Sequence, residues 1–196
     1  MMMNPFLQEF MDSVGPQASR EMSKSLGINK RTAQQIIPQL VPLILGGLKR
    51  QKDERGGAPR VNHILNKYGS PDALDNIHDL FQTRARETQP DPRLGGLVGE
   101  SGIQASEMLS EKFGLDSNTV MKIIPMIAPL VLGFLTRKRD QQGLGSQGIA
   151  SLLDQDGDGS VLDDVAGFLM QNLSGSSSQR RGNVLGNLLG GLLSRR

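Results

Sequence analysis

The apolar sequence IIPQLVPLILGGL at residues 36–48 has a second copy, IIPMIAPLVLGFL, at residues 123–135. In the first copy and its N-terminal flank, apolar residues stand at positions 33, 36, 37, 40, 41, 44, 45 and 48. This spacing is the 3.6-residue period of a helix that buries one side. The sequence therefore predicts two long core helices, around which the remaining chain folds.

Each of the two segments contains a pair of prolines four residues apart, Pro38 and Pro42 in the first and Pro125 and Pro129 in the second. A proline inside a helix costs about 3 kcal/mol, because it lacks the N–H donor and its ring clashes with the preceding turn. The apolar stripe nevertheless continues past both prolines. We expect one bent helix per segment, with a break into two short helices as the alternative.

The duplication extends beyond the apolar segments. Residues 15–54 align without a gap with residues 102–141, and residues 65–75 align with residues 153–163. LGNLLG near the C-terminus repeats LGGLVG at residues 94–99. The chain is therefore an internally duplicated unit, followed by a third copy of the unit's opening segment.

These alignments divide the chain into two pseudo-repeat units, residues 5–82 and 94–172, then a flexible linker at 173–182 and a C-terminal helix at 183–196. Aromatic residues are few, with six Phe, one Tyr and no Trp, whereas there are 24 Gly. This composition favours aliphatic helices in close contact over a β-sandwich. The predicted fold is a single all-α domain covering residues 1–196, built around two proline-bent core helices.

The two long helices are predicted to begin at side-chain caps and to differ in burial. Asn29 and Asp116 precede them and are good N-caps, and each follows a glycine suited to ending the previous helix, Gly27 or Gly114. The second copy replaces three small or polar residues of the first by large apolar ones, with Met121, Met126 and Phe134 in place of Gln34, Gln39 and Gly47. We expect the segment 123–135 to be the more deeply buried.

Several classes of function have no support in the composition. The net charge of +2 gives no bulk attraction to nucleic acid, and the absence of cysteine excludes disulfides and thiol chemistry. Neither His63 nor His78 has a histidine counterpart in the other copy, and no nucleophile arrangement is recognisable. We therefore expect a protein that is not an enzyme. The chain shows no signal peptide and no run of about 18 to 20 apolar residues, so we expect a cytoplasmic protein.

The segment DQDGDGS at residues 154–160 is the strongest local motif. It resembles the first half of a calcium loop, in which oxygens of spaced carboxylates converge on the ion and a glycine makes the turn. The loop lacks its usual closing glutamate, because Val165 stands there. The predicted metal ligands, for a weak Ca²⁺ site, are Asp154, Asp156, Asp158, Ser160, Asp163 and Asp164.

A second interpretation of this segment needs no metal. Ser160 and Asp163 have the spacing of a capping box at a helix start. The first copy has Asn66, Tyr68 and Ser70 at the equivalent positions, which cannot hold a cation, so the turn itself does not require one. Both interpretations stay open at this point.

The C-terminal helix and the basic runs carry the remaining hypotheses. The segment 183–196 has an apolar face and basic residues, so it is expected to dock on the second unit, in cis or swapped from another copy, or to lie on a membrane surface. Each long helix ends in a basic run, at residues 49–52 or 137–139, which either complements the helix dipole or forms an anion-binding patch.

Several of these segments resemble a known family. LDQDGDGSVLDDVAGFL at residues 153–169, the proline-containing helices and the LGNLLGGLL tail resemble the bacterial domain of unknown function 937. SLGINKRTAQQIIP at residues 25–38 is more distantly similar to the YidB proteins. The resemblance implies an all-helical bacterial protein without an assigned activity.

The sequence thus predicts a non-catalytic helical binding or scaffolding protein with a weak calcium loop. The alternative is a peripheral membrane or envelope-associated protein that acts through the C-terminal helix. A protein partner or self-association through that helix is expected, and a nucleic-acid partner is not.

Overall fold

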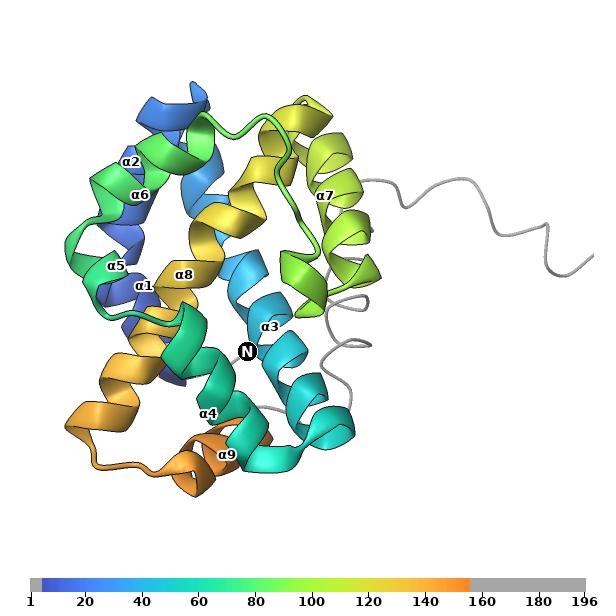
Figure 1. Cartoon of the computed structure of the whole chain (residues 1–196). Coiled ribbons are helices and arrows are strands. Elements are labelled where there is room, and N and C mark those ends of the chain that lie inside the picture. Colours follow the sequence, from blue (N-terminus) through green and yellow to red (C-terminus); the bar gives the residue numbers. More distant parts are fainter. Residues whose placement is uncertain (1–4, 156–196) are drawn as a thin grey trace, which may run out of the picture.

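The computed structural model describes residues 5–155, and every regular element in that range is a helix (Figure 1). The all-α prediction is confirmed. The elements are α1 (Pro5–Ser13), α2 (Gly15–Leu26), α3 (Lys30–Arg55), α4 (Gly57–Tyr68), α5 (Asp72–Asp75), α6 (Ile77–Ala85), the 3₁₀ turn η1 (Leu94–Gly96), α7 (Glu100–Phe113), α8 (Ser117–Gln141) and α9 (Ser146–Gln155).

The two long helices α3 and α8 each continue without interruption through both of their prolines. The alternative of a break near a proline is therefore wrong. Both helices begin at the predicted caps: the Asn29 Oδ1 atom accepts a hydrogen bond from the Arg31 N–H (2.8 Å), and the Asp116 Oδ1 atom accepts one from the Thr119 N–H (3.0 Å). These acceptors satisfy amide groups that a helix start leaves unpaired.

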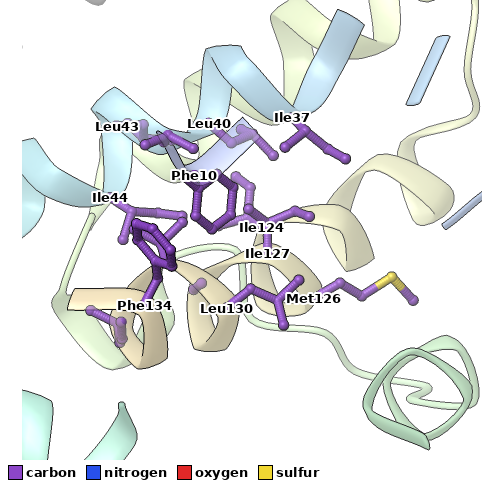
Figure 2. Close-up of a cluster of buried hydrophobic side chains, with 14 of the residues drawn as sticks. Phe10, Ile37, Leu40, Leu43, Ile44, Ile124, Met126, Ile127, Leu130 and Phe134 are labelled. Carbon is purple, nitrogen blue, oxygen red and sulfur yellow. The ribbon is translucent and has the colours of Figure 1, made fainter. Parts of the chain in front are cut away.

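The hydrophobic core lies between α3 and α8 (Figure 2). Within residues 123–135 only Pro129 is partly exposed, whereas Pro38, Gln39 and Pro42 are partly exposed in the first copy. The second copy is thus the more buried, as predicted. By length and composition α8 is also suited to cross a membrane, but 78% of its most apolar window is buried inside the protein. Its hydrophobicity is accounted for by its place in the core.

The first unit covers part of the second unit's core helix. The rings of Phe6 and Phe10 in α1 meet the ring of Phe134 in α8 edge-on, with centroids 5.4 and 5.6 Å apart. This edge-to-face arrangement places the positive ring edge against a negative face. The two units therefore share one hydrophobic core.

The duplication is visible in repeated hydrogen bonds. The Ser19 hydroxyl donates to the Gly15 carbonyl (2.6 Å), and the Ser106 hydroxyl donates in the same way to the Gly102 carbonyl (2.9 Å). The predicted stop at Gly27 adopts φ +68°, and Gly114 adopts φ +61°. Only glycine takes this left-handed conformation readily, which is why both copies end the short helix there.

The chain turns at Asn76, between the short helices α5 and α6. The stretch 72–81 is not one helix, because α5 ends before Asn76 and α6 begins after it. The backbone N–H of Asn76 (3.0 Å) and its side-chain Nδ2 (3.1 Å) both donate to the Asp72 carbonyl. A short polar side chain that competes for a backbone carbonyl in this way favours a turn over a continuing helix.

Candidate functional site

The predicted calcium loop is described only at its first acid, Asp154 near the end of α9. Its carboxylate pairs with Lys52 and lies 3.8 Å from the Lys49 ammonium nitrogen. Burial alone would lower the pKa of Lys52, but hydrogen bonds to Asp154 and Asp53 raise it overall. Asp154 thus fastens α9 to the end of α3.

The other predicted ligands, Asp156, Asp158, Ser160, Asp163 and Asp164, lie outside the described residues. Between residues 5 and 155, no three acidic or histidine side chains gather in a way that would hold a metal ion. The C-terminal helix predicted at 183–196 also lies outside this range.

Both basic runs are occupied by contacts within the protein. In the first, Arg50 Nη2 donates to the carbonyls of Leu97 (3.1 Å) and Gly96 (3.3 Å). In the second, Arg137 pairs with Asp75 (3.0 Å), and Arg139 Nη1 donates to the Asn62 side chain (2.6 Å). These contacts tie the ends of the long helices to their neighbours, which favours the structural interpretation of the runs over a free anion-binding patch.

His78 also has a structural partner. Its Nδ1 atom lies 2.7 Å from Oε2 of Glu21, a carboxylate that is buried in α2. The hydrogen bond with His78, followed by that from Lys24, holds the pKa of Glu21 below its ordinary value. The contact joins α2 to α6, and neither residue lines the pocket described below.

The structure contains a pocket of about 410 Å³ that the sequence did not predict. Residues of α3, α4, the end of α6, the connection between α6 and α7, and α8 line it. Figure 1 shows this connection running from the end of α6 down to α7. The volume falls within the range of about 300 to 1,000 Å³ that is usual for small-molecule sites.

The floor of the pocket is apolar and comes mainly from α8. Pro125, Ala128, Pro129 and Leu132 stand on one side of this helix, since their spacing of three and four residues repeats the helical period. Ile64 of α4 and Leu97 add to this floor, and both are buried. A proline in this face has no N–H, so the two proline rings add apolar surface and no donor.

The wall made by the connection is held tightly. Asp91 accepts hydrogen bonds from the N–H groups of Arg93 (2.9 Å) and Gly95 (2.7 Å). A Cβ atom at Gly47 of α3 would lie only 2.6 Å from the Leu97 carbonyl oxygen, so the wall touches the α3 backbone. The polar, proline-rich composition of this segment indicates a mobile linker, but the contacts show that its C-terminal part is packed.

Leu94 in this wall has a strained backbone. Its φ is +52°, and it is the one non-glycine residue with positive φ among residues 5–155. For an L-residue this conformation costs about 1–2 kcal/mol. Strain of this kind is kept where the surroundings impose it and is frequent at ligand sites.

The mouth of the pocket is polar and aromatic. The lining residues that reach the surface define this mouth: Arg55, Gln89 and Tyr68 are exposed, and Arg84 is partly exposed. Tyr68, at 56%, is the exposed large hydrophobic side chain of the described range. Arg84 is paired with Glu87. An exposed aromatic ring at the edge of an apolar cavity is suited to contact a ligand.

The sequence carried one signal for this site. Tyr68 occupies the position of Asp156 in the second copy, so the two copies differ in chemistry there. The remaining lining residues are far apart in the chain, from Gln51 to Leu132, and no spacing rule brings them together.

The described part is thus an internally duplicated helical protein with a pocket beside its central helix and no recognisable catalytic group. The chain belongs to a family of bacterial proteins of unknown function, DUF937, whose model matches residues 8–139 and again residues 137–196. This confirms the family resemblance, and the two matches agree with the internal duplication. The similarity to YidB proteins stays a prediction. Comparison with curated proteins and with solved structures finds no match.

Proposed function

We propose that the protein is a non-catalytic binding protein that holds a small organic ligand in the pocket between α4, α8 and the connection from α6 to α7. The observation that carries the proposal is the pocket itself: an apolar floor on the core helix faces a polar mouth. Ligand sites likewise combine apolar surface with polar groups that fix the orientation of the ligand. The strained Leu94 in its wall supports the same location.

The ionisable groups whose pKa is shifted have structural partners. Catalytic acids and bases have perturbed pKa values inside a cleft. The groups with a shifted pKa between residues 5 and 155 are Glu21, Lys52, Asp53 and Asp116. Each of them takes part in an ion pair or a helix cap, and none lines the pocket.

A fluorescence titration with 1-anilinonaphthalene-8-sulfonate, a dye with an apolar body, tests the proposal on the full chain. Saturable binding is expected, reduced at least tenfold by Ala128→Phe, which fills the floor, and several-fold by Tyr68→Ala at the mouth. Tyr68 is exposed, so Tyr68→Ala is expected to fold even if Ala128→Phe does not. Arg20→Gln, an exposed arginine of α2 outside the pocket, is the matched control. Unchanged binding in both pocket variants would refute the proposal.

The calcium loop is a separate hypothesis that rests on residues 154–164. The pairing of Asp154 with Lys52 competes with a role for this acid as a ligand, because an ion would have to displace the ammonium group. A calcium titration by calorimetry, with Asp156→Ala beside the native chain, tests it. No heat at millimolar calcium would contradict it.

The membrane alternative rests on residues 183–196 and has its own test. Co-sedimentation with anionic vesicles is expected only for the chain that keeps this segment. Equal sedimentation of the full chain and of a chain ending at residue 182 would refute it.

A further inference from the structure

From the charges around the pocket we infer that its ligand is an amphipathic monoanion: one carboxylate held at Arg55 and Arg60, and an apolar body lying on the α8 floor. This inference rests on the proposed function, since it names the ligand class of the same pocket. The charge of the ligand is tested with octyl compounds, separately from the dye titration that tests whether the pocket binds a ligand.

Two of the three arginines that line the pocket are available to a ligand. Arg84 is paired with Glu87. Arg55 and Arg60 have no carboxylate partner among residues 5–155, although both line the cavity. A guanidinium group binds a carboxylate through two parallel N–H donors, so such unpaired arginines beside an apolar floor suit an anionic head group.

Arg60 is held in place by a buried amide. Its Nε atom donates to Oε1 of Gln51 (3.1 Å), and Gln51 is only 4% exposed. The Gln51 amide nitrogen lies 3.5 Å from the Gly96 carbonyl oxygen, which joins this contact to the pocket wall. The contact uses only the Nε donor and leaves the Nη groups of Arg60 without a partner in the described range. Gln51 is therefore a positioning residue for Arg60.

The charge of the lining sets the charge of the ligand. Three arginines stand against the carboxylates of Glu87 and Asp91, which leaves one net positive charge. One negative charge neutralises this lining, whereas a second would be repelled by the two carboxylates. A monoanion therefore fits better than a dianion such as a phosphate monoester.

The floor sets the nature of the rest of the ligand. Ala128, Leu132 and the ring of Pro125 are buried and offer no side-chain hydrogen-bond donor or acceptor. A sugar or a nucleotide base placed there would leave polar groups unpaired, at a substantial cost in affinity. An alkyl or aryl body is the chemistry that this surface accepts.

Calorimetric titrations of the full chain with four octyl compounds test the inference. Octanoate is expected to bind about ten- to hundredfold more tightly than octanol, because its carboxylate can form one or two charge-assisted hydrogen bonds to the arginines. Octylammonium is expected to bind more weakly than octanol, and octyl phosphate as a dianion more weakly than octanoate. Tighter binding of octyl phosphate would overturn the monoanion assignment.

Two substitutions connect the selectivity to Arg60. Arg60→Gln is expected to reduce octanoate affinity about tenfold and to leave octanol affinity unchanged. Gln51→Glu supplies a competing carboxylate to Arg60 and should weaken octanoate in the same selective way, while Arg20→Gln should change neither. Equal losses for octanoate and octanol in Arg60→Gln would refute the role of the arginine.

The outcomes separate the two proposals. If octanol and octanoate bind equally and Ala128→Phe blocks both, the charge inference fails and the pocket proposal stands. If no octyl compound binds and the dye titration is unaffected by Ala128→Phe and by Tyr68→Ala, both fail.

Discussion

The contact of Gly47 with the pocket wall leads to a prediction whose sign depends on two opposing effects. Gly47 lies inside α3, where replacing glycine by alanine would ordinarily stabilise the helix by about 1 kcal/mol. A Cβ atom at this position would, however, lie 2.6 Å from the Leu97 carbonyl oxygen and 3.1 Å from a Val98 methyl carbon. The neighbour in the first contact is backbone, which cannot turn aside as a flexible side chain can.

Overpacking of this kind costs about 1–3 kcal/mol, because either the wall or α3 must shift. A 2.6 Å contact with backbone takes the upper part of this range, about 2–3 kcal/mol, so after the gain of about 1 kcal/mol in helix propensity Gly47→Ala is expected to lower the free energy of unfolding by about 1–2 kcal/mol. For a chain of this size that is a fall in melting temperature of about 2–8 °C. The displaced wall should also weaken dye binding in the pocket.

Thermal unfolding followed by circular dichroism measures this effect, and Gly15→Ala provides the matched control. The Cβ atom at Gly15 would meet the Met11 Cε atom at 2.9 Å, but that atom is the far end of a flexible side chain. Gly15→Ala should therefore leave the melting temperature nearly unchanged. A Gly47→Ala protein as stable as the native chain, with unchanged dye affinity, would refute the contact as described.

Four further outcomes are expected. The pKa of Glu21 is lowered in the folded state, so the stability that its carboxylate contributes is present above about pH 4.5 and is lost as the pH falls through the folded pKa. The free energies of unfolding of Glu21→Gln and of the native chain, measured in urea, should therefore become equal in acid. Asn29→Ala should cost about 1 kcal/mol by urea unfolding, and Asn29→Asp, which keeps the capping oxygen, almost nothing. Leu94→Gly should be nearly neutral in melting temperature, because relief of about 1–2 kcal/mol of strain offsets the lost side chain, whereas the β-branched Leu94→Val should be destabilising. Pro129→Ala in α8 and its counterpart Pro42→Ala in α3 should each stabilise their helix, by up to about 3 kcal/mol. Only Pro129→Ala should change dye affinity, because Pro129 lines the pocket and Pro42 does not. Equal effects of the two substitutions on affinity would contradict the place of Pro129 in the floor.

The main features of the fold follow from local patterns. The period of the apolar stripes predicts the two core helices, and the caps at Asn29 and Asp116 fix where they start. The predicted continuation of each helix through its two prolines is confirmed. Burying a whole apolar face stabilises the helix by more than the two interrupted hydrogen bonds cost. The break at Asn76 cannot be read from such patterns, since a single side chain that competes for a carbonyl leaves no periodic signal.

The candidate pocket could not be predicted in the same way. Its charged residues, Arg55, Arg60 and Arg84, read as ordinary solvated side chains of helices or their ends. Their shared location depends on how α4 and the end of α6 pack against α8, which is a tertiary property. The sequence predicts a site at the acidic loop instead, because the spacing of metal ligands lies within one short segment and can be recognised before the fold is known.

The pocket also shows how a duplicated chain acquires a site that one unit does not have. Both core helices carry the same proline pattern, since Pro38, Val41, Pro42 and Leu45 of α3 correspond to Pro125, Ala128, Pro129 and Leu132 of α8. In the described range, the pocket is lined by the second set. One of its walls is the connection between the units, and another is α4 of the first unit. The site therefore combines parts of both units: the second unit supplies the floor on α8, and the first unit supplies α4 with Tyr68, which the second copy replaces by an acid.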